Sequence, residues 1–167
     1  MSTLPPPRLV VTAHTEDGTS VFQSDTEVQP FFPFGPNGSS FSNFYHSPQV
    51  PVSNTSFPPN LSNELPRCPP AGVSFVVSDY PPGVKVPTHR TLSQDYAVVI
   101  FGEIVLSLDG GEQKTIRAGE FIVQRGVNHS WSNQTQSPCR VMFVMVAAEQ
   151  VVLGNGVGLE ETIIGKR

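Results

Sequence analysis

The chain has 167 residues, of which 38% are hydrophobic and 14% are charged, and its formal net charge is −4. This length suits one domain with a substantial core and is short for two. The low charge and the lack of a clustered basic run argue against nucleic acid as a partner. The longest apolar stretches, such as VMFVMVAA at 141–148, are far too short to span a bilayer, so we expect no membrane partner.

The N-terminus, MSTLPPPRLVV, lacks the charged start, long apolar stretch and small-residue cleavage site of a secretory signal peptide. We therefore expect a cytoplasmic protein. In that compartment its two cysteines, Cys68 and Cys139, are expected to be reduced thiols.

The first predicted element is a β-hairpin, because RLVVTAH at 8–14 and TSVFQSD at 19–25 flank the turn sequence TEDG. Residues 26–72 follow, rich in proline, serine, asparagine and phenylalanine. Proline removes backbone donors and blocks helices, so we expect an extended, irregular arm here. Its phenylalanines indicate packing on the domain's own outer face or on a second subunit. We predict a homodimer in which this N-terminal arm covers a sheet edge of the partner, since uncovered edges promote aggregation.

Residues 73–148 change to short β-rich segments separated by glycine, proline, asparagine and aspartate. LDGGE at 108–112 is a tight-turn signal, and EIVLSLD at 103–109 alternates apolar and polar residues as a half-buried strand does. No segment has helical periodicity. The pattern predicts an all-β sandwich or small barrel over 73–148, with residues 1–72 packed on it and 149–167 as a C-terminal tail.

The histidine at position 89 belongs to a spaced motif. Gly83, His89, Asp95 and Gly102 follow the spacing glycine, five residues, His-x-His, three residues, acid, six residues, glycine. This resembles the first motif of the cupin family, except that Thr91 replaces the second histidine and aspartate replaces glutamate.

A second motif lies in AGEFIVQRGVNHSWSN at 118–133, where Gly119, Gly126, His129 and Asn133 resemble the second cupin motif. The usual proline is absent, and the gap from Gly119 to His129 is one residue shorter than the common form. The two motifs are separated by 16 residues, close to the short linker typical of the family. The resemblance implies a cupin-type jelly-roll β-barrel that carries the N-terminal hairpin and the Pro/Phe-rich arm.

The resemblance also implies a site. Residues 89 and 91 are two apart on a predicted strand and share a face, which lines the barrel interior in cupins. We predict that His89, Asp95 and His129 converge there as catalytic residues and as ligands of a divalent metal. Two imidazoles and one carboxylate suit Fe(II), which we favour over Zn(II). The alternative is an acid–base site without metal.

Three further residues are predicted to bind substrate. Thr91 supplies a hydroxyl near the proposed ligands, and the guanidinium group of Arg125 can bind a substrate carboxylate. Trp131 shares the face of His129 by alternation and could stack on an aromatic substrate, although packing in the core also explains a single tryptophan.

The run HRTLSQDYAVVIFGEIVLSLDGGE, with AGEFIVQRGVNHSWSN and PCRVMFV, is similar to small single-domain cupins found in bacteria and fungi. Fungal members include cupin-domain oxidoreductases of polyketide, salicylaldehyde-type clusters. The resemblance implies an enzyme that tailors a polyketide-derived, secondary-metabolite intermediate. Two alternatives stay open: a lyase or isomerase, such as a dehydratase or cyclase, in the same pocket, and a non-catalytic module that binds a small molecule. The sequence has no glycine-rich nicotinamide or flavin fingerprint.

Overall fold

The computed structural model describes residues 4–55 and 63–162, and within these ranges the chain forms ten β-strands and no α-helix. The strands are β1 Arg8–His14, β2 Ser20–Glu27, β3 Ser40–Ser47, β4 Val73–Tyr80, β5 Ser93–Phe101, β6 Glu103–Leu108, β7 Gln113–Arg117, β8 Phe121–Arg125, β9 His129–Ser132 and β10 Cys139–Ala147. The all-β prediction is confirmed. In the same ranges no helix is long and apolar enough to cross a membrane.

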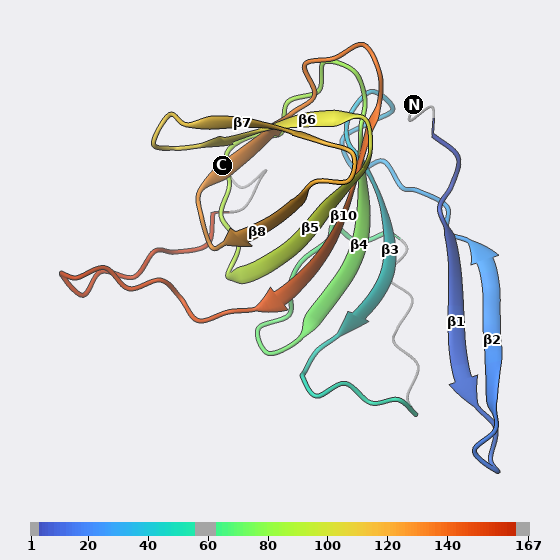
Figure 1. Cartoon of the computed structure of the whole chain (residues 1–167). Coiled ribbons are helices and arrows are strands. Elements are labelled where there is room, and N and C mark those ends of the chain that lie inside the picture. The colour runs from blue at the N-terminus through green and yellow to red at the C-terminus, as the bar shows by residue number, and fades with distance from the viewer. Residues whose placement is uncertain (1–3, 56–62, 163–167) are drawn as a thin grey trace.

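Two antiparallel sheets make the barrel. The larger sheet has the order β3-β4-β10-β5-β8, and the smaller sheet, β7-β6-β9, lies across from part of it (Figure 1). Alternate residues of the central strands point between the sheets, as the burial of every second residue at the start of β5 shows. The core therefore lies inside the barrel. Both sheets contribute to it, the large sheet with Val76, Val99, Val141 and Phe143 and the small sheet with Ile104 and Trp131.

The chain changes sheets at Gly102, between β5 and β6. Gly102 has a φ of +75°, which L-residues rarely adopt, and a Cβ there would lie 2.5 Å from the carbonyl oxygen of Pro138. Glycine thus permits the sharp corner that sends β5 along the large sheet and β6 along the small one. This is the last glycine of the first sequence motif, so the motif marks a barrel corner.

The predicted N-terminal hairpin is confirmed. β1 pairs with β2 from Arg8↔Glu27 to His14↔Ser20, with an irregularity after Val11. The hairpin stands beside β3 and apart from the barrel sheets (Figure 1). It forms a two-stranded sheet of its own.

The prediction of an irregular arm over 26–72 is wrong for one segment. β3 falls inside it and pairs with β4 from Ser40↔Asp79 to Ser47↔Val73, which makes β3 an edge of the large sheet. SFSNFYHS contains no proline, so its backbone can pair along its whole length. Part of the predicted arm therefore belongs to the barrel sheet.

The strand predicted to carry residues 89 and 91 is also only partly correct. This segment makes isolated bridges, Lys85↔Ser132 and His89↔His129, and no continuous strand. Pro87 lies between the two bridges and has no N–H to donate, which interrupts the ladder. His89 is nonetheless fixed opposite β9.

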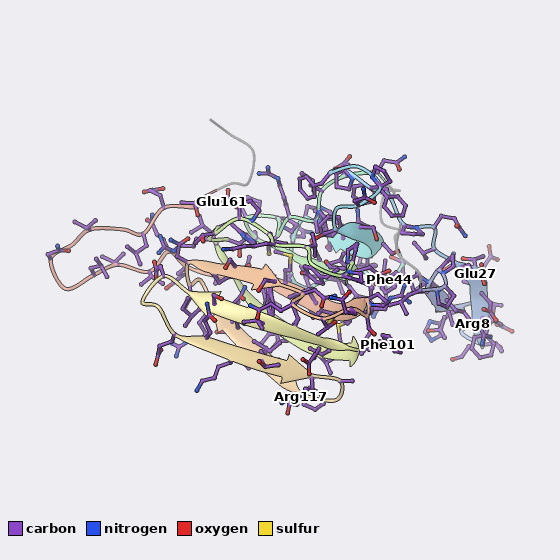
Figure 2. All side chains as sticks on the ribbon, turned by 90° about the horizontal axis from the view of Figure 1, so that it is seen from above. Arg8, Glu27, Phe44, Phe101, Arg117 and Glu161 are labelled. Carbon is purple, nitrogen blue, oxygen red and sulfur yellow. The ribbon has the colours of Figure 1, made fainter. Side chains whose placement is uncertain are left out.

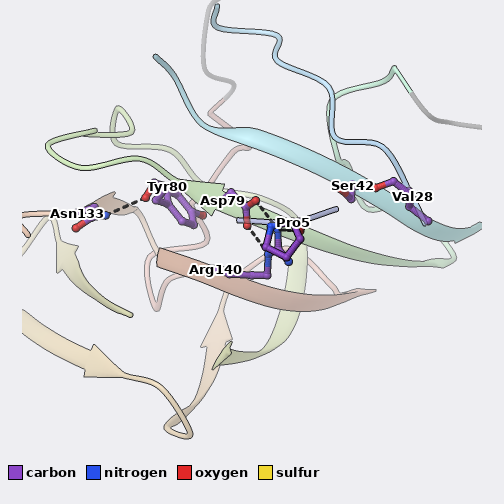
Figure 3. A network of polar contacts seen from close by, with 7 residues as sticks. All are labelled: Pro5, Val28, Ser42, Asp79, Tyr80, Asn133 and Arg140. Atoms are coloured by element: carbon purple, nitrogen blue, oxygen red, sulfur yellow. Dashed lines mark hydrogen bonds and ion pairs between the residues drawn. The ribbon is translucent and has the colours of Figure 1, made fainter. Parts of the chain in front are cut away.

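A buried ion pair ties the N-terminal segment to the barrel. Arg140 donates from Nε and Nη2 to the two carboxylate oxygens of Asp79, at 2.6 and 2.7 Å, and from Nη2 to the carbonyl of Pro5 at 2.9 Å (Figure 3). The same view shows Asn133 donating to the carbonyl of Tyr80, at 2.8 Å. The last residue of the second sequence motif thus joins β9 to the end of β4.

Candidate functional site

The first feature of the site is a pair of histidines. His89 and His129 exchange both backbone hydrogen bonds, each at 2.9 Å, so their side chains lie directly opposite each other. Their ring centroids are 4.3 Å apart, with an angle of 52° between the ring planes. His129 is almost fully buried and His89 is partly buried. The structure therefore brings together one histidine from each motif, as predicted.

Both imidazoles are held in the same tautomer. His89 Nδ1 lies 2.9 Å from the carbonyl oxygen of Pro87, and His129 Nδ1 lies 3.0 Å from that of Val127. A carbonyl oxygen can only accept, so each Nδ1 carries the proton and each Nε2 keeps a lone pair. Such nitrogens can accept a proton, accept a hydrogen bond or bind a metal.

Burial keeps this pair neutral. It lowers the pKa of His129 to about 4, with a further lowering from the charge of a protonated His89 and a smaller opposing effect from the bond to Val127. Burial also lowers the pKa of His89, against the bond to Pro87, which raises it. Both rings are thus free bases at neutral pH.

Asp95 occupies a different environment in the barrel interior. It lies on β5, opposite Met145 on one side and Gln124 of β8 on the other. Its carboxylate accepts a 2.6 Å hydrogen bond from Ser93 Oγ and a 3.1 Å bond from Gln124 Nε2. Burial raises the pKa of Asp95 to about 6, although these two donors favour the ionised form and oppose the shift.

A chain of hydroxyl groups leads from Asp95 toward the surface. Ser93 Oγ lies 2.6 Å from Asp95 Oδ1 and 2.9 Å from Thr91 Oγ1. Ser93 has a single hydroxyl proton and donates it in the hydrogen bond to an ionised Asp95, so Ser93 Oγ accepts the hydrogen bond from the Thr91 hydroxyl. Thr91 is therefore connected to a buried carboxyl group through one hydroxyl.

Thr91 borders an apolar pocket of about 120 Å³ beside the end of β4. Phe34 and Phe41 line it from the N-terminal region, and Tyr80 and Val86 line it from the barrel side. The pocket is also bordered by residues 65–67 and by the tail at 161–162. The tail is held there by backbone bonds between Arg90 and Thr162.

The other predicted substrate residues lie in different places. Arg125 ends β8 and lines a second cavity of about 150 Å³, which Thr91 also borders. Trp131 is 2% exposed and its ring packs near those of Tyr80, His129 and Phe143. Stacking of Trp131 on a substrate stays a prediction; in the structure this ring is part of the core.

The donor set fits a metal only in part. The two Nε2 lone pairs suit a divalent ion, but the described residues contain no group of three or more His, Cys, Asp or Glu side chains arranged to hold one. Among the described residues, Asp95 does not join the two histidines as a third ligand, and the three-ligand site stays a prediction. The aspartate is one methylene shorter than the usual glutamate, and Ser93 and Gln124 hold its carboxylate. Metal binding itself stays a prediction.

Sequence reasoning missed several residues of the site. Ser93 could have been found, because it is two residues before Asp95 and so shares its face on a strand. Gln124 could not, because its place opposite Asp95 depends on the β5–β8 register. The aromatic lining from Phe34 and Phe41 depends on how the N-terminal region folds back over the barrel.

Comparisons with known proteins match the part of the chain that carries both histidines. The cupin domain family model matches residues 76–145, which include both histidines of the pair. Protein J of the oryzines biosynthesis cluster of Aspergillus oryzae is 32% identical over 160 residues, covering 92% of this chain and 89% of that protein. The chain is also 32% identical over 158 residues to the cupin-domain-containing oxidoreductase fogC of Aspergillus ruber, covering 90% of this chain and 76% of the relative. The chain belongs to the cupin family.

Among solved structures, this cupin is similar to the Cnp3 cupin domain of Schizosaccharomyces pombe. The TM-score is 0.53 with 10% sequence identity, covering 84% of this chain and 87% of the other. That likeness shows the fold alone. The motif-based resemblance to cupins and to cupin-domain oxidoreductases of biosynthetic clusters is thus confirmed.

Proposed function

We propose that this cupin is an oxidoreductase that tailors a small, polyketide-derived intermediate of secondary metabolism. The observation that carries the proposal is the neutral imidazole pair, His89 and His129, in a barrel whose apolar pocket lies two residues along the chain, at Thr91. The name of fogC, a relative that is similar along most of its length, supports the reaction class.

The pocket favours a largely apolar substrate. Aromatic and aliphatic side chains form most of its wall, and Thr91 and Thr162 provide hydroxyl groups at its border. A volume of about 120 Å³ suits part of a small aromatic or aliphatic molecule, such as an alcohol or aldehyde. The polar end of that molecule would face Thr91 and the apolar body would contact Phe34 and Phe41.

The chain's own residues would handle protons. Neither histidine lines the pocket, so a substrate would have to extend past Thr91 to reach an Nε2 atom of the pair. That atom can accept a proton, since both rings are unprotonated at neutral pH. The Thr91 hydroxyl would orient the substrate. Ser93 holds that hydroxyl through a hydrogen bond, and Asp95 in turn holds Ser93. The electrons need an acceptor or donor from outside the protein's own side chains: oxygen with a bound metal, or a partner that brings a cofactor.

A second candidate is a lyase or isomerase. The hydrogen-bonded path from Asp95 through Ser93 to Thr91 favours it, because it connects a carboxyl group whose pKa is about 6 to the pocket border. A group with that pKa can both give and take a proton near neutral pH, as a dehydratase or cyclase requires.

Incubation with 2-hydroxybenzyl alcohol and with 2-hydroxybenzaldehyde, in air with added Fe(II) and, in parallel, with oxidised or reduced nicotinamide cofactor, followed by mass spectrometry, tests the proposal. A product that differs from its substrate by two hydrogens or one oxygen supports an oxidoreductase. Binding without turnover contradicts it and favours a binding module, and loss of water or an isomeric product favours the second candidate. His129→Gln should remove turnover, whereas His14→Gln, on the exposed hairpin, should leave it unchanged.

A further inference from the structure

The C-terminal tail, 149–162 in the described part of the chain, encloses the second cavity against the end of the barrel. The tail runs outward after β10 and turns back (Figure 1). A 2.8 Å backbone hydrogen bond from Leu159 to Val151 joins its two limbs, and the Arg90↔Thr162 bridge fixes its return to the barrel. Val151 and Leu159 line the cavity of about 150 Å³ from the tail, and Arg90 and Arg125 line it from the barrel. A molecule bound there would therefore contact both parts.

The two arginines of this cavity have hydrogen-bond donors to spare. Arg125, the last residue of β8, makes no hydrogen bond or ion pair with any described residue. Arg90 donates from Nε to the carbonyl oxygen of Gly126 at 3.1 Å and from Nη1 to that of Glu160 at 3.4 Å, which leaves its Nη2 group without an acceptor in the described ranges. A guanidinium group carries its N–H donors in a planar fork that matches the two oxygens of a carboxylate. The two side chains therefore supply the donors of an anion site.

The wall of the cavity has a net positive charge. Glu149 is the one acidic residue that lines it, against two arginines. None of the ion pairs between described residues joins Glu149 to an arginine, so direct contact with this carboxylate neutralises neither guanidinium group. A singly charged acid would balance the charge of the wall, with Glu149 opposing its approach.

The rest of the wall is largely apolar. Leu92, Ala148, Val151 and Leu159 line the cavity beside the charged groups. Cavities of about 150 Å³ in proteins can hold a benzene ring. The cavity therefore suits a molecule with a carboxylate at one end and a small apolar body at the other. An acid as small as acetate would leave the apolar part of the wall exposed to water.

We propose that the second cavity binds a small organic acid, whose carboxylate contacts Arg125 and Arg90 and whose apolar body packs against the tail. The ligand chemistry of Arg125 is the one predicted from the sequence. The site, however, lies apart from the histidine pair, and it shares only Thr91 with the apolar pocket. Binding of the acid is independent of the reaction proposed above.

Isothermal titration calorimetry with benzoate tests the proposal, at low ionic strength because salt screens exposed charges. Benzoate should bind the wild type at least about tenfold more tightly than benzyl alcohol, which lacks the charge, or acetate, which lacks the ring. A wild type that does not bind benzoate overturns the proposal. So does an affinity for either of the other two compounds that equals the affinity for benzoate.

Two substitutions in the cavity should change the affinity in opposite directions. Arg125→Gln should weaken benzoate binding at least about tenfold because it removes the free guanidinium group, and Glu149→Gln should tighten binding about threefold because it removes the opposing charge. Arg117→Gln is the matched control and should leave the affinity unchanged. Arg117 is an exposed arginine on β7 that pairs with Glu103 at 3.2 Å, and Figure 2 shows it well apart from Glu161 of the tail. Equal losses in the two arginine variants contradict the site, and far-UV circular dichroism checks that each variant is folded.

Hydrogen exchange tests where the acid binds. Saturating benzoate should slow exchange of the Leu159 and Thr162 amides, because a ligand that contacts both tail and barrel opposes the opening of the bonds that hold the tail. The β1–β2 hairpin should exchange at an unchanged rate, and Arg125→Gln should abolish the protection of the tail. Benzoate that binds without protecting the tail overturns the proposal.

Discussion

Gln124 donates a 3.1 Å hydrogen bond from Nε2 to Asp95 Oδ2, while the Oε1 atom of the same amide has no hydrogen-bond partner among the described residues. Both side chains are buried. This amide orientation matches an ionised aspartate, which can only accept. A protonated Asp95 has an O–H to donate, and a half-turn of the amide would let Oε1 receive it.

Asp95→Asn should therefore stabilise the protein in a pH-dependent way. The pKa of Asp95 is about 6 in the folded chain against 3.8 for an ordinary aspartate, so its stabilising effect is complete below pH 3.8 and is lost as the pH rises through 6. Relative to wild type, the free energy of unfolding of the variant should be about 2 kcal/mol larger at pH 7 than at pH 4. Urea unfolding at both pH values measures it.

His129→Gln is the opposite case and serves as an internal check. The pKa of His129 is lowered to about 4, so its neutral form stabilises the fold above the ordinary value of 6.5, and this is lost as the pH falls through 4. The free energy of unfolding of the variant, relative to wild type, should therefore be larger at pH 4 than at pH 7. A pH-independent difference for both variants would contradict the buried environments.

The buried ion pair gives a second prediction. Arg140→Ala should lower the free energy of unfolding by about 3–5 kcal/mol, because it leaves the buried Asp79 carboxylate without its bidentate partner and frees the Pro5 carbonyl. Chemical denaturation measures the loss.

Arg8→Ala is the matched control for that prediction. Arg8 makes the same two-pronged contact with Asp25, at 2.6 Å for both bonds, but on the exposed hairpin. Exposed pairs contribute little. Equal effects of the two substitutions would show that burial does not decide the strength of the Arg140 pair.

The sequence was sufficient to predict the all-β fold, the N-terminal hairpin and the positions of the two motifs. Alternation and turn residues located the hairpin and most barrel strands, and the motif spacing located His89, His129 and the corner at Gly102. β3 was not predictable because the prolines around SFSNFYHS dominate the composition of its neighbourhood. Its place in the sheet is decided by pairing with β4, a long-range contact that local sequence does not encode.

The candidate site was predictable only in part for the same reason. The resemblance to the cupin motif placed Asp95 inside the barrel, and its side chain is buried there. Which group the carboxylate contacts depends on the β5–β8 register, which presents Gln124 to it. Spacing can therefore identify interior residues without showing which of them meet.

A third prediction concerns Gly72, before β4. A Cβ at this position would lie 1.9 Å from the carbonyl oxygen of Ser47 and 2.7 Å from the carbonyl carbon of Pro48, so the backbone itself must move. Gly72→Ala should cost at least about 2 kcal/mol of unfolding free energy. Gly110→Ala, where nothing lies within 4 Å of the added carbon, should change it by less than about 0.5 kcal/mol, as thermal unfolding of both variants can verify.

The last prediction distinguishes a metal site with three protein ligands, as expected from the sequence, from a site in which only His89 and His129 bind the metal. If the histidine pair alone supplies the protein ligands, His129→Gln should abolish binding of Fe(II) and Zn(II) after chelation and refilling. Thr91→His should tighten binding at least about tenfold by adding an imidazole on the face of His89. Asp95→Asn should alter affinity less than about threefold, because Ser93 and Gln124 hold that carboxylate.

Equilibrium dialysis with metal analysis, repeated across pH, decides between the two. Protons compete for the imidazole lone pairs, so affinity should fall as the pH drops toward 4, where His129 titrates, rather than near the ordinary histidine value of 6.5. A loss of more than about tenfold in Asp95→Asn would restore the three-ligand site. It would also mean that metal draws the carboxylate away from Gln124, leaving the whole amide free to turn.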